Sequence, residues 1–290
     1  MKRIYPDETW PESWKRSYDY DLLDVYGDTS NLGYSYAYSL RSSKALGMLA
    51  SVLKPGDRVL DMAAAQGNFS LALAEMGFAV TWNDIREDLV EYVRLKYEFG
   101  TIDYAPGNAF EVEFPHLFDA VLITEVIEHV AHPDQFLARV ATLVKPGGHV
   151  VMTTPNGAYF RNTLPRFSSC ADPSVYEAIQ FKPDADGHIF LMHPDELAPL
   201  AAQAMLTIES VTMFNNPLTS GYLGSRAVLK RLPRSFVNFA ERLSQRLPSL
   251  LAERLLVQMA VLLRRPLDST RGQNRSSASP AATSPSRAVA

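Results

Sequence analysis

Short apolar runs alternate with amphipathic stretches between about residue 57 and residue 215. The apolar runs have few polar positions, as expected of strands that are covered on both faces; they are RVLDM, AVTWND, FDAVLIT and HVVMTTPN. The stretches between them, such as FSLALAEMG and PDQFLARVATLV, carry apolar residues at helical spacing. This alternation predicts an α/β fold with a mostly parallel sheet and helices on both faces.

The chain outside this region has different patterns. The N-terminal part is rich in aromatic residues and ends in a helical pattern over residues 40–53. Near the C-terminus, residues 226–246 predict a helix with an apolar stripe, and residues 250–266 predict a second, almost wholly apolar helix. We therefore divide the chain into an N-terminal helical cap (1–54), an α/β domain (55–215), a basic helical extension (216–265) and a disordered tail (266–290).

Composition and charge indicate the cellular location of the protein and the kinds of partner that it binds. Cys170 is the single cysteine, so no disulfide forms within the chain and a cytoplasmic location is expected. The first residues carry charges and prolines where a signal peptide carries an apolar run. The net charge of −4 predicts no nucleic-acid partner for the whole molecule.

The extension differs from the rest of the chain in charge. Residues 226–265 contain nine arginines and lysines against two glutamates. A basic, apolar helical pair can pack on its own domain, form a homodimer, or lie on the inner face of an anionic membrane as a peripheral contact. These alternatives stay open at this point.

Candidate chemistry begins at the loop VLDMAAAQGNF, where a predicted strand ends and a helix starts. Small side chains let the backbone approach a ligand closely, and the first turn of a helix offers unpaired N–H groups. Asp84 follows at the end of the next strand, where a carboxylate can accept hydrogen bonds from ribose hydroxyls. These features alone fit either a dinucleotide or an adenosine-containing ligand.

A series of further motifs follows in order. It consists of Gly107-Asn108-Ala109-Phe110, Phe118-Asp119-Ala120-Val121-Leu122, Glu125-Val126-Ile127-Glu128-His129-Val130, Lys145-Pro146-Gly147-Gly148 and Thr154-Pro155-Asn156. With this series the chain resembles the class I S-adenosyl-L-methionine-dependent methyltransferases over about residues 55–215. It is most similar to the small-molecule group that includes ubiquinone-type O-methyltransferases. The resemblance implies a Rossmann-like, seven-stranded sheet and methyl transfer to an oxygen of a small-molecule acceptor, with a nitrogen or a carbon as less favoured alternatives.

The same resemblance assigns a set of residues to the cofactor. It places Asp61, Ala63, Ala65, Gly67 and Asn68 around the methionine part, Asp84 at the ribose hydroxyls, Ile85, Asn108 and Ala109 at the adenine, and Thr124 and Glu125 in the pocket after the fourth strand. The chain departs from the family pattern at two places. Alanines 63 and 65 replace the first two glycines of a G-x-G-x-G loop, and Asn108 replaces an aspartate.

Two histidines are candidates for the catalytic base. His129 follows the fourth strand, and His188 lies in the irregular segment that supplies the acceptor pocket in the resembled family. A histidine pKa lies near neutrality, so either side chain can take a proton from an acceptor hydroxyl. For each histidine, a purely structural role is the alternative. No metal is expected, because the acidic and histidine residues near His129 match no known ligand pattern of metal-using relatives.

The aromatic N-terminal cap can also contribute to the site. We expect Tyr34 and Tyr38 to approach the cofactor. Two other functions remain open for the chain: a non-catalytic cofactor-binding or scaffold protein, motivated by Ala63 and Ala65, and an NAD-dependent oxidoreductase.

Overall fold

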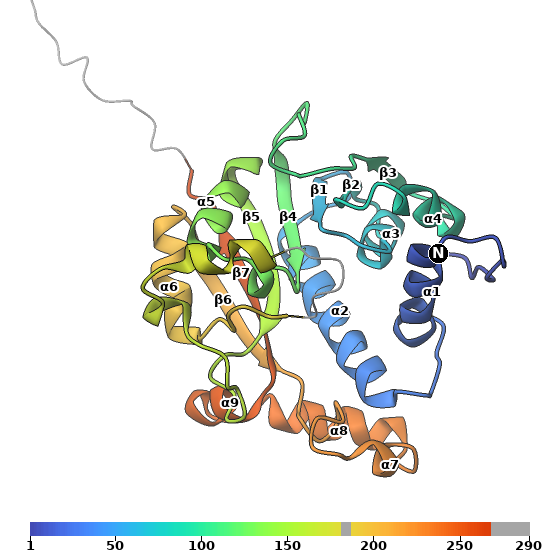
Figure 1. Cartoon of the computed structure of the whole chain (residues 1–290), viewed down its shortest axis with the longest axis vertical. Helices are drawn as coiled ribbons and strands as arrows, with labels where there is room; N and C mark the ends of the chain where they lie inside the picture. Colours follow the sequence, from blue (N-terminus) through green and yellow to red (C-terminus); the bar gives the residue numbers. More distant parts are fainter. Residues whose placement is uncertain (181–186, 268–290) are drawn as a thin grey trace, which may run out of the picture.

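A seven-stranded sheet with the order β3-β2-β1-β4-β5-β7-β6 runs through the computed structural model, which describes residues 1–180 and 187–267 (Figure 1). Its strands are β1 (Arg58–Met62), β2 (Ala79–Asn83), β3 (Thr101–Tyr104), β4 (Phe118–Thr124), β5 (Val144–Pro155), β6 (Thr207–Phe214) and β7 (Gln258–Arg264). Strand β7 is antiparallel to both of its neighbours, and the other described strands share one direction. The predicted α/β fold with a mostly parallel, seven-stranded sheet is confirmed.

Helices cover both faces of this sheet (Figure 1). Val140 and Leu197 pack on one face, and Leu49 and Leu73 pack on the other. Successive strand residues point to opposite faces, so the strands between the two helical layers are buried on both sides. The helices are α1 (Glu12–Asp24), α2 (Leu32–Val52), α3 (Asn68–Glu75), α4 (Leu89–Lys96), α5 (Pro133–Leu143), α6 (Pro194–Gln203), α7 (Arg226–Leu229), α8 (Arg234–Ser244) and α9 (Ser249–Leu255), with the short 3₁₀ helices η1 (Ile127–His129), η2 (Phe167–Ser169) and η3 (Pro173–Ile179).

A buried ion pair attaches the N-terminal helix α1 to the domain. Lys96 Nζ of α4 lies 2.7 Å from Asp21 Oδ2 of α1, and both side chains are fully buried. Lys96 also donates to Asn68 Oδ1 at 2.8 Å, while Asn68 Nδ2 and Tyr92 Oη donate to the Asp21 carboxylate. A buried ion pair is tolerated when such hydrogen bonds satisfy both charges. The network therefore holds α1 beside the first residue of α3, next to the loop that follows β1.

The C-terminal extension differs from its predicted structure. The prediction of a continuous helix over residues 250–266 is wrong, because α9 ends at Leu255 and Gln258–Arg264 forms strand β7. Every residue of β7 except Arg264 is buried. A strand covered on both faces carries an unbroken apolar run, which periodicity alone does not distinguish from a buried helix. Strand β7 thus completes the sheet from a segment that follows the predicted α/β domain.

The predicted helix over residues 226–246 is present as two helices, α7 and α8, with Pro233 before the start of α8. Its apolar stripe is not covered by the domain, because Phe236, Phe239 and Leu243 are exposed. Packing of the helical pair on its own domain was one of the arrangements left open: the second segment packs in this way as β7, whereas the stripe of α8 does not. The predicted disordered tail lies, from residue 268 on, outside the described residues.

Replacing a side chain of β7 tests the strand assignment. Leu263 is buried, so we expect Leu263→Ala to lower the free energy of unfolding by about 2–5 kcal/mol. Leu250 in α9 is 78% exposed, and Leu250→Ala serves as the matched control with an expected change within about 0.5 kcal/mol. Urea unfolding of both variants provides the measurement. Equal, small effects would contradict a central position for β7.

Candidate functional site

The loop between β1 and α3 follows the path expected of a glycine-rich loop although two of its expected glycines are alanines. Ala63, Ala65 and Gly67 have φ angles of 56°, 49° and 74°. This left-handed region is favourable for glycine and costs an alanine about 1 kcal/mol. At Gly67 a Cβ would lie 2.7 Å from both methyl groups of Val93, so only glycine fits there. The alanines therefore keep the loop geometry at the expense of local strain, which often marks functional sites.

The end of strand β2 holds this loop in place. Asp84 Oδ2 accepts a hydrogen bond from the Ala65 N–H at 2.7 Å, and the Trp82 indole donates to the Ala65 carbonyl at 3.0 Å. On the β1 side, the buried Asp61 accepts from the Ser70 hydroxyl at 2.5 Å. Asp61 thus lies beneath the loop and anchors the start of α3. The predicted contact of Asp61 with the methionine part of the cofactor stays a prediction.

Asp84, the predicted ribose ligand, is at the carboxyl end of β2 as expected. Its carboxylate is almost completely buried and accepts from the backbone N–H of Ala65 and of Arg86. The Arg86 guanidinium donates to both oxygens, at 3.0 and 3.1 Å. These donors match the capacity of a carboxylate, which accepts about four hydrogen bonds. Ribose hydroxyls would replace the guanidinium, and Arg86 is half-exposed and attached by a flexible stem.

The predicted adenine residues lie beside Asp84. Ile85 is 57% exposed, which gives a planar ring an apolar surface to cover. Asn108 Oδ1 accepts from the Phe110 N–H at 3.1 Å, and its second lone pair stays available to an amino group. Asn83, which the sequence patterns did not single out, donates to the carbonyls of the loop after β3 at Ala105 and Gly107. In the sequence, the only signal for this pair of hydrogen bonds is an asparagine at the end of a predicted strand.

After β4 the chain turns at Glu125, which has a φ of 54°. Its carboxylate accepts from Thr153 Oγ1 at 3.0 Å and from Gln258 Nε2 at 2.9 Å, and it lies 3.3 Å from Arg41 Nη1. Glu125 therefore joins β4, β5, β7 and α2. Arg41 and Gln258 are far from Glu125 in sequence and could not be predicted as its partners. The neighbouring Thr124 is half-buried at the end of β4.

The N-terminal cap reaches the loop through α1 and α2. Gln66 Nε2 donates to Asp24 Oδ2 at 3.1 Å, and burial raises the pKa of Asp24 to about 7. The Arg41 guanidinium stacks over the Tyr38 ring, 5.3 Å from its centroid. Tyr34 is close enough to Asp24 and Arg41 for their charges to affect its pKa, which burial raises. The cap therefore brings both predicted tyrosines near residues that contact the loop.

The structure brings together the two candidate bases, His129 and His188, although 58 residues separate them in the sequence. Their ring centroids are 4.9 Å apart. The Glu128 carbonyl accepts from the Ile189 N–H at 2.7 Å, which fixes the segment after His188 against η1. One carboxylate oxygen of Glu128 and one ring nitrogen each of His129 and His188 lie within 4.8 Å of one another. Burial raises the pKa of Glu128 well above its usual range.

This cluster differs from the acidic and histidine set considered in the sequence. His132 points elsewhere and pairs with Glu177 Oε1 at 2.8 Å. The spacing of Glu128, His129 and His188 is compatible with a cation or with a proton relay. The expectation that no metal binds stays a prediction.

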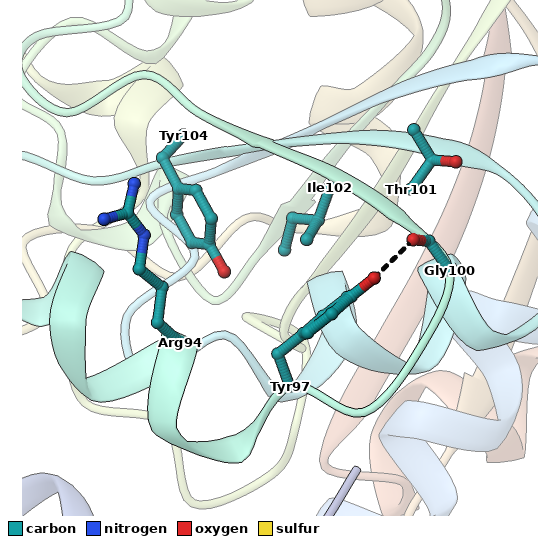
Figure 2. Close-up of a pocket in the computed structure, with 6 residues that line it drawn as sticks. All are labelled: Arg94, Tyr97, Gly100, Thr101, Ile102 and Tyr104. Carbon is teal, nitrogen blue, oxygen red and sulfur yellow. Dashed lines mark hydrogen bonds between the residues drawn. The ribbon is translucent and has the colours of Figure 1, made fainter.

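Two surface hollows lie apart from the predicted cofactor residues. Figure 2 shows the one beside the edge strand β3, of about 430 Å³, where the Tyr97 hydroxyl donates to the Gly100 carbonyl at 2.7 Å. The Arg94 guanidinium stacks over Tyr104 in the same hollow. The other, of about 440 Å³, lies between the segment after β5, the start of α6 and α9. Neither hollow is lined by a residue that the sequence predicts to bind the cofactor.

The buried Asp61 predicts a pH dependence of stability. Burial raises the pKa of Asp61 to about 7, so the folded protein retains a proton that the unfolded chain has already released. The free energy of unfolding should fall as the pH rises from about 4 to about 7. Asp61→Asn lacks the titrating carboxyl. Between about pH 4 and pH 7, the free energy of unfolding of Asp61→Asn should therefore rise by about 2–4 kcal/mol relative to that of the wild type. Urea unfolding over this range, with Asp103→Asn at an exposed position as the control, provides the measurement; parallel curves for wild type and Asp61→Asn would contradict the assignment.

Comparisons with known proteins show the family to which the chain belongs. A methyltransferase domain family matches residues 36–211. The ubiquinone biosynthesis O-methyltransferase of Thiobacillus denitrificans is 34% identical over 172 residues, which cover 58% of this chain and 72% of that protein.

Two solved structures show the same fold. One is the magnesium protoporphyrin IX methyltransferase of Synechocystis PCC 6803 with bound S-adenosylhomocysteine, with 13% identity, a TM-score of 0.52 and coverage of 88% of this chain and 93% of the other. The other is the [4+2]-cyclase SpnF, with 15% identity, a TM-score of 0.52 and coverage of 88% and 97%. At these identities the structural likeness concerns the fold alone. The family match and the identity to the curated relative show that the chain belongs to the methyltransferase domain family and is a class I S-adenosyl-L-methionine-dependent methyltransferase.

Proposed function

We propose that the enzyme methylates a hydroxyl oxygen of a small-molecule acceptor and that His129 and His188 handle the hydroxyl proton. The observation that carries this proposal is the approach of the two rings, 4.9 Å between centroids, at a turn that directly follows β4. Strands β1, β2 and β4 are parallel, so their following loops share one edge of the sheet. The histidines are therefore on the same side as the Asp84 loop.

Methyl transfer to a hydroxyl oxygen requires a base only to take the proton of the acceptor hydroxyl. The bound cofactor supplies an electrophilic methyl group on a sulfonium sulfur. The acceptor oxygen forms the new bond to this carbon, the carbon–sulfur bond breaks to leave S-adenosylhomocysteine, and the hydroxyl proton passes to a histidine. An imidazole is suited to this because its pKa is close to neutral pH. In this proposal one imidazole ring of the pair accepts the proton, and the second ring orients the first ring.

The protein also has to hold the two reactants in line. Backbone groups of the strained loop and the Asp84 carboxylate would fix the cofactor from one side, as the family resemblance implies for Ala63, Ala65, Gly67 and Asn68. Such positioning supplies much of the acceleration of a transfer between two bound reactants. The Asn68 side chain is hydrogen-bonded to Asp21 and Lys96. We therefore propose that Asn68 contacts the cofactor through its backbone.

The acceptor class is proposed from the relatives. The curated relative is named for ubiquinone biosynthesis, so phenolic quinone precursors are the first acceptors to test. The conformation of Ala63 and Ala65 argues against a mere scaffold, because the loop geometry survives the loss of two glycines. The family match likewise does not favour an NAD-dependent oxidoreductase.

We further propose a cytoplasmic location, supported by the single cysteine. No helix within residues 1–180 and 187–267 is long and apolar enough to span a bilayer. The two external partners left open by the sequence, a membrane surface and a second copy, would both meet the extension that carries α7, α8 and α9.

Replacing the paired histidines tests the proposed proton transfer. We expect His129→Ala and His188→Ala to lower kcat by about 100-fold or more, since a positioned base contributes 10²–10⁴-fold. Affinity for S-adenosylhomocysteine should stay within about twofold of the wild type. Turnover of labelled cofactor with a phenolic acceptor provides the measurement, and His132→Ala is the control. Unchanged turnover in either variant would remove that histidine from the mechanism.

A further inference from the structure

The chain between β6 and β7 must lie at the same edge of the sheet as the cofactor loops. Strand β6 points in the direction of β5 and ends at Phe214, and β7 returns antiparallel from Gln258. Residues 215–257 therefore leave and re-enter the sheet at the carboxyl ends of the parallel strands. Helices α7, α8 and α9 lie together at this end of the molecule (Figure 1).

Helix α8 has two distinct faces. Val237, Glu241 and Ser244 are its buried residues and attach it to the protein. Phe236, Phe239 and Leu243 are three and four residues apart, so they share another face, and their exposed fractions are 54%, 61% and 58%. The neighbouring helices also carry exposed apolar side chains, at Val228, Leu250, Leu251 and Leu255. We call the exposed apolar residues of α7, α8 and α9 the apolar face.

Basic side chains lie beside the apolar face. Arg242 and Arg246 follow Phe239 and Leu243 by three residues each, which places a line of arginines directly beside the apolar stripe. The exposed basic side chains from α7 to α9 are Lys230, Arg231, Arg234, Arg242, Arg246 and Arg254. Within the described part of the chain, none of these six forms an ion pair with a carboxylate.

The two acidic residues of this segment do not offset that charge at the surface. Glu241 is buried and accepts hydrogen bonds from the Asn216 N–H and the Thr219 hydroxyl. Glu253 is only half-exposed. The surface of α7, α8 and α9 therefore combines exposed apolar rings with unneutralised cations.

We infer that the apolar face and its arginines dock the enzyme onto an anionic lipid bilayer. An amphipathic helix binds such a surface by inserting its apolar side chains while its basic residues meet the lipid phosphates. Arginine suits this position because its stem lies along the apolar region and its guanidinium reaches the headgroups. A second copy fits less well, because a two-fold interface would place each set of cations against its own symmetry mate.

Docking through this face would also orient the active site. Lys44 Nζ of α2 donates to Gln245 Oε1, directly after α8, at 2.7 Å, and α2 carries the Arg41 that pairs with Glu125. The docked surface is thus connected to the cofactor edge of the sheet. This consequence, unlike docking itself, rests on the proposed methyl transfer: an apolar acceptor dissolved in the bilayer would be delivered to the side where it reacts.

Vesicle flotation without cofactor or acceptor tests the docking, so its outcome does not depend on the proposed reaction. We expect the wild type to float with vesicles of phosphatidylcholine and phosphatidylglycerol and not with phosphatidylcholine alone. The pair Phe236→Ser and Phe239→Ser should weaken binding at least tenfold. The pair Arg242→Gln and Arg246→Gln should weaken it about tenfold or more, and salt should weaken the wild type similarly.

Control variants separate docking from misfolding. Phe99→Ser removes an equally exposed ring far from α8 and should leave vesicle binding unchanged. All variants should keep the wild-type melting temperature, because the replaced side chains are exposed. A wild type that fails to float with anionic vesicles, or pairs that float as well as the wild type, would overturn the inference. A lipid-free dimer that the phenylalanine pair abolishes would assign the face to a second copy instead.

Discussion

The position of β7 between β5 and β6 is the constraint on which much of the molecule depends. This strand pairs with both neighbours along its whole length, and its side chains are buried on both faces of the sheet. Because it runs antiparallel, the chain that precedes it has to gather at the carboxyl edge of the parallel strands. The first residue of β7, Gln258, also donates to Glu125 and so takes part in the site. One strand therefore completes the core, supports the turn after β4 and places α7, α8 and α9 at the sheet edge that carries the candidate site.

The loops that are predicted to bind the cofactor are held by hydrogen bonds within the protein. Asp84 is fixed by two backbone N–H groups, and the loop that it supports keeps a left-handed path at Ala63 and Ala65. The buried pair of Asp21 and Lys96 extends this order to the N-terminal cap, since it also fixes Asn68 at the start of α3.

Local sequence patterns predict a structural feature correctly where it depends on residues that are close in the sequence. They do not predict it where it depends on residues that are distant in the sequence. The strands around Asp61 and Asp84 were predictable, because buried strands carry short apolar runs and acidic residues end them. Strand β7 was mistaken for a helix, since an apolar run buried on both faces has no strand period. The pairing of Arg41 with Glu125 and the contact of His129 with His188 join residues from separate segments, so no spacing in the sequence indicates them.

Calorimetric titration of S-adenosylhomocysteine tests the central claim most directly, with the wild type, Asp84→Ala and Asp103→Ala measured side by side. Asp84 lies at the end of β2 within the loops, whereas Asp103 is an exposed acid on the neighbouring strand β3. We predict binding by the wild type and by Asp103→Ala, and affinity at least tenfold weaker in Asp84→Ala, because the loss of hydrogen bonds to a charged group costs about 1.5–3 kcal/mol. Absence of binding to the wild type, or equal affinity in Asp84→Ala, would contradict the placement of the cofactor at this edge of the sheet.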